Sequence, residues 1–167
     1  MTDPTPTHLP ILTQHCRFCS HLLLATTRDL STLPRRDNGA QDKALILPLE
    51  NTTRDAEAAQ SGPESIKHAS VLLSTTIPDR RATLIRREDG IEKRVLLRCG
   101  RCRVVVGYYL DRVHWASGQK DKEADVEGEE RPPAVYILPG AMVETEKMGG
   151  EGVGEKEWRG WNDGVAA

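Results

Sequence analysis

Four cysteines carry the clearest chemical signal in this chain of 167 residues. They form two C-x-x-C pairs, Cys16 with Cys19 and Cys99 with Cys102, and no other cysteine is present. Two thiolates from each of two tight turns complete a tetrahedral set of four sulfur ligands, the usual coordination of structural zinc. The 79 residues between the pairs permit a shared ion, because the entropic cost of closing a loop grows slowly with its length. The spacing therefore predicts one structural Zn²⁺ ion bound by all four cysteines.

Other uses of these cysteines are less favoured. Disulfides within each pair are unusual in the reducing cytosol or nucleus. A redox C-x-x-C pair usually opens a helix in a βαβ unit, whereas apolar, strand-like runs follow both pairs here. A thiol oxidoreductase is therefore the least favoured function of this chain. His15 and His21 flank the first pair; with four thiolates available, we expect them at most to support the ligands through hydrogen bonds.

The second cysteine pair lies between predicted strands. Residues 82–87 and 91–98 flank the dipeptide Asp89-Gly90, a hairpin signal because glycine tolerates the positive φ of a primed turn. After the C-G-R-C turn, residues 104–110 are rich in Val and Tyr, which suit a pleated surface. The sequence therefore predicts a hairpin, a cysteine turn and a third strand in succession.

Further short strands are predicted on both sides of this unit. Residues 22–27 follow the first cysteine pair as an apolar run, and residues 8–13 fit an edge strand because they contain a proline. Residues 44–49 fit a strand or a buried loop, and the mixed pattern of residues 66–76 gives no assignment. Residues 134–143 predict a final hairpin around a Pro-Gly turn.

The fold predicted from these elements is a small all-β domain of the β-tent or zinc-ribbon type, clamped by zinc between two cysteine hairpins. We assign residues 8–143 to this single zinc-binding domain, with flexible loops at 37–65 and 111–133. Residues 1–7 are predicted to be a disordered leader and residues 144–167 an acidic tail rich in Gly and Glu. Only 4% of the residues are aromatic, which excludes a large core.

Charge is unevenly distributed along the chain. The net charge is −2, but residues 80–103 hold nine basic and three acidic residues. Residues 119–131 and 144–163 each hold six acidic and three basic residues.

The cations next to the second hairpin and cysteine turn, over residues 84–103, are Arg86, Arg87, Lys93, Arg94, Arg98, Arg101 and Arg103. They predict either a solvated outer face or a positive surface for an acidic protein segment, phosphoinositide headgroups or RNA phosphates. No aromatic residue is interleaved with these arginines to stack bases, which weakens the RNA interpretation.

No arrangement of residues predicts catalysis. His8, His68 and His114 are scattered without a nucleophile or carboxylate in a motif, and the chain has neither a glycine-rich phosphate loop nor an H-E-x-x-H motif. A closed four-cysteine site has no open position for a reacting water. We therefore expect a protein that is not an enzyme. No apolar run approaches the length of a membrane span and no secretory signal is recognisable, so we expect the cytoplasm or the nucleus.

Three blocks of the sequence resemble the STING ER exit protein family, also called the STEEP family. They are CSHLLLATTRDLSTLPRR (19–36), LIRREDGIEKRVLLRCGRC (84–102) and VYILPGAMV (135–143). Similar blocks occur in that family in the same order, and the R-R-x-x-G-I-E-K-R block followed by C-x-x-C is the most specific.

The resemblance implies a non-enzymatic adaptor protein. Members of the family are connected with export of the receptor STING from the endoplasmic reticulum through COPII-dependent trafficking and phosphatidylinositol 3-phosphate. The implied partners are trafficking machinery or membrane cargo, and the implied location is the ER surface. Members are also associated with spliceosome-related complexes, so the alternative is a nuclear RNA-processing factor that uses the basic hairpin 84–103.

Overall fold

The computed structural model describes residues 9–37, 41–49, 68–114 and 132–148 as an all-β fold. Its antiparallel strands form two sheets, and the helical segments among these residues are short 3-10 turns, η1 (Leu30–Thr32), η2 (Arg112–His114) and η4 (Thr145–Lys147). The small all-β class predicted from the sequence is therefore confirmed. None of the described residues forms a helix long and apolar enough to cross a membrane.

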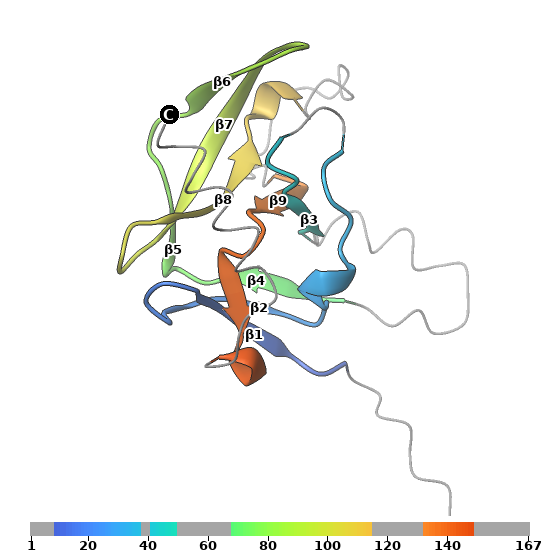
Figure 1. Ribbon diagram of the computed structural model, residues 1–167, viewed down its shortest axis with the longest axis vertical. Helices are drawn as coiled ribbons and strands as arrows, with labels where there is room; N and C mark the ends of the chain where they lie inside the picture. Colours follow the sequence, from blue (N-terminus) through green and yellow to red (C-terminus); the bar gives the residue numbers. More distant parts are fainter. Residues whose placement is uncertain (1–8, 38–40, 50–67, 115–131, 149–167) are drawn as a thin grey trace, which may run out of the picture.

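The first sheet has four strands in the order β10-β1-β2-β4. Their bounds are β10 (Met142–Glu144), β1 (Leu12–Cys16), β2 (Leu22–Thr26) and β4 (Ser70–Leu72). This sheet forms the base of the view in Figure 1. It includes part of the segment 66–76 that the sequence left unassigned, because Ser70–Leu72 pairs with the edge of β2.

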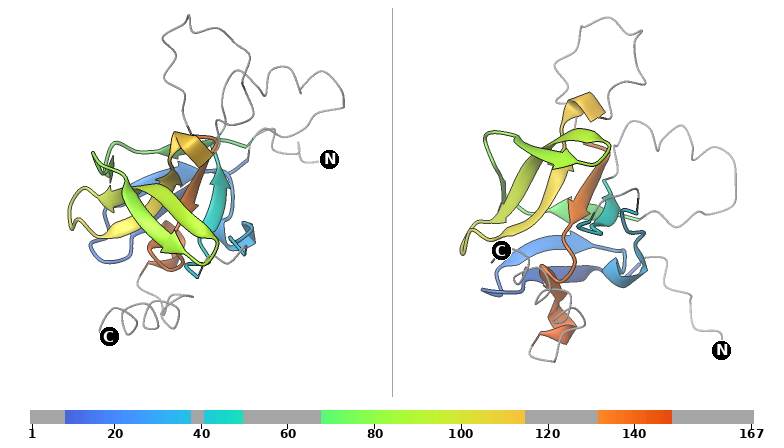
Figure 2. Two further views of the ribbon diagram at one scale, coloured as in Figure 1. Left: turned by 90° about the horizontal axis from the view of Figure 1, so that it is seen from above. Right: turned by 45° about the horizontal axis from the view of Figure 1, so that its top comes forward.

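The second sheet has six strands and stands above the first in Figure 1 and in the right view of Figure 2. Its order is β3-β9-β8-β7-β5, and β6 also pairs with β7. The bounds are β3 (Leu45–Pro48), β9 (Ala134–Ile137), β8 (Val105–Leu110), β7 (Gly90–Cys99), β5 (Thr76–Pro78) and β6 (Thr83–Arg87). The ten-residue strand β7 is the long element of this sheet and ends at the second cysteine pair.

One hydrophobic core lies between the two sheets. The four-stranded sheet contributes Leu23 and Leu24, and the six-stranded sheet contributes side chains such as Leu47, Leu97 and Val135, all 0–2% exposed. Burying an aliphatic side chain of this size stabilises the fold by about 1.5–3 kcal/mol. The same buried cluster includes Cys16, so the core and the cysteine turns belong to one structural unit.

The hairpin predicted over residues 82–98 is confirmed, with a turn displaced by one residue. Arg87 pairs with Gly90, so the two-residue loop is Glu88-Asp89 and not Asp89-Gly90. Gly90 opens β7 with φ +141°, a backbone conformation that favours glycine. The dipeptide therefore identified the hairpin correctly, although the glycine lies just after the loop.

The final hairpin predicted over residues 134–143 is wrong. Strand β9 pairs with β3 and β8 in the six-stranded sheet, whereas β10 pairs with β1 in the four-stranded sheet. The connecting turn is held between the sheets, because the Leu138 amide donates to Val106 and the Ala141 carbonyl accepts from Arg17. The Pro-Gly turn thus carries the chain from one sheet to the other. Turn residues do not specify which strand the segment after the turn pairs with.

Three boundaries also differ from the sequence interpretation. Strand β3 lies within the loop 37–65 that was expected to be flexible, and its Leu47 is fully buried. Glu144 belongs to β10 and pairs with Gln14, so the folded part extends beyond residue 143. The turn η2, from the insert 111–133, accepts a hydrogen bond from the Lys93 amide through His114. The leader 1–7, residues 50–65 and 115–131, and the tail from 149 lie outside the described residues.

Candidate metal centre

The first cysteine pair lies in the turn between β1 and β2. The Ser20 amide donates to the Cys16 carbonyl at 2.8 Å, and the Cys16 amide donates to the His21 carbonyl at 2.7 Å. Ser20, directly after the second cysteine, has φ +57°. These two bonds and the left-handed residue reverse the chain and leave the Cys16 and Cys19 sulfurs at one end of the sheet.

The second pair, between β7 and β8, repeats this geometry. The Arg103 amide donates to the Cys99 carbonyl at 2.9 Å, and the Cys99 amide donates to the Val104 carbonyl at 3.0 Å. Arg103 follows Cys102 directly and has φ +66°. The two C-x-x-C turns are therefore equivalent halves, contributed by different sheets.

All four sulfur atoms meet between the two turns. The Cys16 and Cys102 sulfurs are 3.6 Å apart, the Cys19 and Cys99 sulfurs are 3.4 Å apart, and all four lie within 4.8 Å of one another. Tetrahedral zinc with bonds of about 2.3 Å separates its sulfur ligands by roughly 3.8 Å. A disulfide needs about 2.05 Å. The spacing therefore fits a four-cysteine metal site and not disulfide bonds.

Burial of this cluster opposes a redox role. Cys16 and Cys99 are completely buried, and only Cys102 is exposed. Burial raises the pKa of the Cys16 thiol to about 12, although the backbone amides of Cys19 and Phe18 act in the opposite direction. Reactive cysteines have lowered pKa values. Without a cation the Cys16 thiol stays protonated at neutral pH, whereas a bound metal ion holds such a group as thiolate.

The two histidines beside the first pair have different surroundings. The His21 Nδ1 lies 3.9 Å from the Cys99 sulfur, within reach of a supporting contact but outside the set of four thiols. His15 lies between the Ser20 carbonyl and the Thr145 hydroxyl, at 3.0 and 2.9 Å. His15 therefore connects the first cysteine turn to η4.

Two contacts outside the sulfur cluster fix the second turn. Arg101 donates to the Cys19 carbonyl at 3.3 Å, which links one cysteine turn to the other. The Gly100 amide donates to the Thr75 carbonyl at 2.8 Å, and a Cβ at position 100 would lie 2.9 Å from that oxygen. A glycine at this position is required by the close approach of the two backbones.

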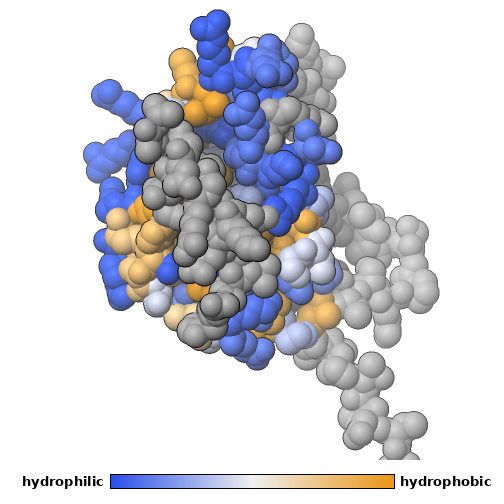
Figure 3. All heavy atoms as spheres, viewed as in Figure 1, coloured by the Kyte–Doolittle hydropathy of each residue, from blue (hydrophilic) through white to orange (hydrophobic). Residues whose placement is uncertain are grey.

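The basic run does not form one outward surface. Paired residues of the β6–β7 hairpin share a face, and neighbouring residues alternate. Arg86 pairs with Ile91 and Leu84 with Lys93, so these four lie on the outer face. Leu84 and Ile91 are 65% and 67% exposed, and hydrophobic atoms lie among hydrophilic ones at the top of Figure 3. The other face carries Arg87, Glu92 and Arg94.

Those inner residues form a buried ion cluster centred on Glu92. Arg36 donates to both carboxylate oxygens of Glu92, at 2.9 and 2.8 Å, and Arg87 donates at 2.7 Å. Arg94 donates to Glu92 through Nε and to Asp42 through Nη1, the latter at 2.6 Å. Burial alone would raise the pKa of Glu92, but the hydrogen bonds from Arg36, Arg94 and Arg87 outweigh it and hold that pKa well below its usual range.

The prediction of a partner-facing surface is therefore wrong for Arg94, whose side chain is only 10% exposed. The Arg87 side chain is 13% exposed and paired with Glu92. Lys93 pairs with Asp111 at 3.2 Å and Arg98 with Asp79 at 2.8 Å. Among the predicted cations, Arg86, Arg101 and Arg103 are exposed. The strand alternation therefore directs Arg87 and Arg94 toward internal partners.

Sequence reasoning missed the other members of the cluster, Arg36, Asp42, Tyr108 and Tyr136. The two tyrosine rings stack with centroids 5.2 Å apart, and the Arg94 guanidinium lies 4.0 Å from the Tyr108 centroid. Arg36 lies 5.0 Å from the Tyr136 centroid. The register of the β6–β7 hairpin could have revealed this cluster from the sequence. It places Glu92, the single acidic residue of β7, between cations on one face of that strand.

A family model described as the STEEP1 domain matches residues 6–152 of this chain, a span that contains the ten strands of the described residues and both cysteine turns. A comparison with curated proteins finds no match.

Proposed function

The chain belongs to the STEEP1 domain family, and on that premise we propose that it is a non-enzymatic adaptor whose fold is stabilised by one structural Zn²⁺ ion. The observation that carries this proposal is the meeting of four cysteine sulfurs, two from each sheet, within 4.8 Å. Four thiolates occupy all positions of tetrahedral zinc. The centre then serves as a structural clamp, without a position for substrate.

Zinc supplies a cross-link between the two sheets when it is bound. Cys16 and Cys19 extend from the turn between β1 and β2, and Cys99 and Cys102 extend from the turn between β7 and β8. The hydrogen bonds of each turn orient its sulfurs before the metal arrives. Binding energy of a structural zinc site becomes folding energy, on the order of 10 kcal/mol. A domain with few aromatic residues gains much of its stability from such a clamp.

We place the adaptor in ER-to-Golgi transport, through COPII-dependent export of membrane cargo. The support is the resemblance to the STING ER exit protein family, together with the family match over residues 6–152. The partners are then trafficking proteins or cargo tails on the cytoplasmic face of the endoplasmic reticulum. The nuclear RNA-processing alternative has less support, because Arg87 and Arg94 are both paired with Glu92.

Proximity labelling in cells tests this proposal. The full-length chain is fused to a labelling enzyme, and labelled proteins are compared with those from the unfused enzyme. The trafficking proposal expects enrichment of COPII components, ER membrane cargo or both. Enrichment of splicing factors without any trafficking protein would contradict it.

RNA binding in vitro separates the two functions further. The trafficking role expects no salt-sensitive RNA binding by the zinc-loaded chain, since phosphate contacts give affinity a steep salt dependence. Binding that falls with salt and is lost in Arg86→Glu, on the β6–β7 hairpin, but kept in Arg17→Glu, in the first cysteine turn, would favour the nuclear role instead.

A further inference from the structure

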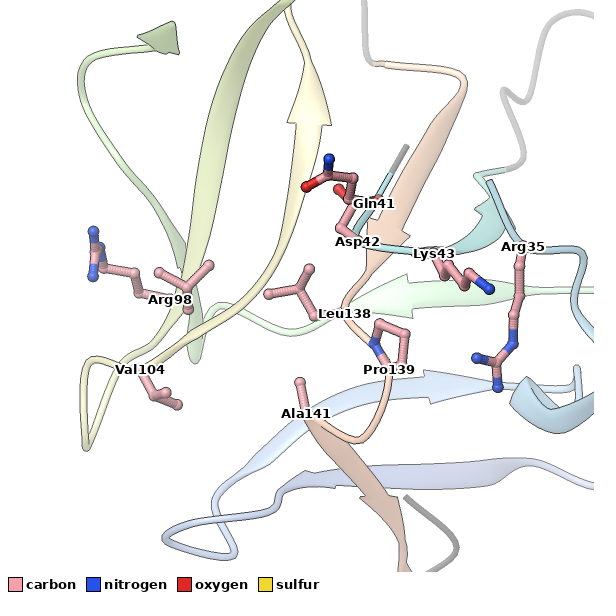
Figure 4. A pocket seen from close by; sticks show the side chains of 10 residues that line it. Arg35, Gln41, Asp42, Lys43, Arg98, Val104, Leu138, Pro139 and Ala141 are labelled. Carbon is pink, nitrogen blue, oxygen red and sulfur yellow. The ribbon is translucent and has the colours of Figure 1, made fainter. Parts of the chain in front are cut away.

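A cavity of about 500 Å³ opens beside the second cysteine turn, between β8 and the segment that carries the chain from one sheet to the other (Figure 4). Its apolar lining comes from Val104, Leu138, Pro139 and Ala141. Ligand sites commonly enclose 300–1,000 Å³ and combine an apolar lining with a few polar groups. The volume and lining of this cavity fit that description.

Cations border the cavity on two sides. Figure 4 places Arg35 and Lys43 together at one side and Arg98 at the opposite side, with Leu138 and Pro139 between them. Two basic side chains that share one end of an apolar cavity favour an anionic group at that end.

Arg98 is already paired with Asp79 at 2.8 Å, which leaves the Lys43 side of the cavity for an anionic group. The acidic residue of the lining, Asp42, has other partners. Asp42 accepts hydrogen bonds from Arg94 at 2.6 Å and from the Tyr108 hydroxyl at 2.8 Å through the same oxygen. Its other oxygen accepts from the Ala44 amide at 3.3 Å. Asp42 therefore belongs to the Glu92 cluster. Within the described residues the Lys43 side chain has no hydrogen bond or ion pair.

The backbone conformation of Lys43 is a second, independent observation that favours a ligand at this cavity. Its φ is +45°, a region that non-glycine residues seldom occupy. The other described non-glycine residues with positive φ are Ser20 and Arg103, and the cysteine turns account for both. Lys43 lies outside the cysteine turns, directly after a turn at Gln41 and Asp42. Uncommon backbone conformations concentrate at ligand sites, and this one holds an unpaired ammonium group at the border of the cavity.

We propose that this cavity binds an extended acidic segment of a partner protein, with an apolar side chain against Leu138 and Pro139 and a carboxylate near Lys43 and Arg35. The inference rests on the proposed adaptor function and names the chemistry of its partner. A protein segment is favoured over a bare inorganic anion, because an inorganic anion has no apolar group to pack against the apolar lining between the cations.

Two synthetic peptides test the site on the full-length, zinc-loaded chain. One is acetyl-Glu-Ala-Leu-Ala-Glu-amide, and the matched control replaces both Glu residues with Gln. Backbone amide shifts are followed by NMR. We expect saturable shifts at Lys43, Val104, Val105 and Ala141 with the acidic peptide, and at least tenfold weaker binding of the neutral one. Equal binding of both peptides, or shifts with inorganic phosphate that match the peptide, would overturn the proposal.

Lys43→Gly is the decisive variant, and Arg103→Gly is its matched control. Each removes one positive charge and relieves one positive φ, but position 103 does not line the cavity. We expect Lys43→Gly to weaken the acidic peptide at least tenfold with an unchanged or higher melting temperature, and Arg103→Gly to change binding less than twofold.

Three outcomes would contradict the site. A lowered melting temperature in Lys43→Gly would assign the residue a structural role. Equal binding by Lys43→Gly and wild type would remove the cation from the site. Shifts of residues 149–167 in Lys43→Gly without peptide would make the chain's own acidic segment the occupant. Zinc content is measured in each variant, so that loss of the metal clamp is distinguished from loss of the peptide site.

Discussion

The cysteine centre and the Glu92 cluster bring distant residues together in different ways. The cysteine centre joins residues of the two sheets through four sulfurs. The Glu92 cluster joins β6, β7 and β8 of one sheet to the segment that carries Arg36 and Asp42. The first holds the sheets to each other, and the second covers the face of one sheet with paired charges.

This difference predicts different responses to perturbation. A four-ligand metal site is cooperative, since removal of one ligand leaves an incomplete site and charged sulfurs without a metal. An ion cluster with several arginines around one carboxylate loses its contacts in steps. We therefore expect the cysteine centre to decide whether the domain folds and the Glu92 cluster to set how stable it is.

Removal of the proposed zinc ion has the largest expected effect. Chelation, or Cys99→Ser, should unfold the domain or cost on the order of 10 kcal/mol, measured by circular dichroism during denaturant titration. His21→Ala is the control, because His21 lies 3.9 Å from the Cys99 sulfur without belonging to the four thiols. It should keep full zinc content. A Cys99→Ser variant with the stability of wild type would contradict the prediction that the cysteine centre, and not the Glu92 cluster, decides whether the domain folds.

Glu92→Gln is the corresponding test of the ion cluster. It leaves Arg36, Arg87 and Arg94 close together without their shared anion, and removal of one partner from a buried pair costs about 3–5 kcal/mol. Glu88→Gln, at the exposed tip of the same hairpin, should change the free energy of unfolding by less than about 0.5 kcal/mol. Equal effects of the two substitutions in chemical denaturation would contradict a structural role of the cluster.

Ser20→Gly and Arg103→Gly test the equivalence of the two cysteine turns. Each residue has a positive φ, at +57° and +66°, which glycine adopts without the steric cost of a Cβ. We expect each substitution to stabilise the zinc-loaded protein by up to about 1 kcal/mol. Thermal unfolding measures both. A stabilisation confined to one turn would show that the halves are not equivalent.

The smallest expected effect is the pH dependence that Glu92 contributes. Its pKa is lower in the folded than in the unfolded state, so its stabilisation is complete above the unfolded value of about 4.3 and declines as the pH falls below it. The stability difference between wild type and Glu92→Gln should shrink by roughly 0.6 kcal/mol between pH 7 and pH 4. A difference that grows on acidification would contradict the ion-paired carboxylate.

The contrast between the two regions also explains what the sequence could predict. Cys16, Cys19, Cys99 and Cys102 repeat one spacing, and few structures other than a metal site use two such pairs between strands. The all-β class, the hairpin of β6 and β7 and the position of β8 follow from local patterns of the same kind. These features depend on residues close together in the chain.

The Glu92 cluster and the strand β10 depend instead on pairings between distant segments. Whether Arg94 faces solvent is decided by the register of β6 with β7 and by Asp42, fifty-two positions earlier. Whether residues 142–144 continue the sheet of β9 is decided by the free edge of β1. A basic run and a Pro-Gly turn carry no information about such partners.

Native mass spectrometry of the full-length chain tests the central claim most directly, that the two cysteine turns share one metal ion. The account predicts one zinc per wild-type chain, and none in either Cys16→Ser or Cys99→Ser, because each turn supplies half of a single site. Two zinc ions per wild-type chain, or one zinc retained after loss of either half, would contradict it.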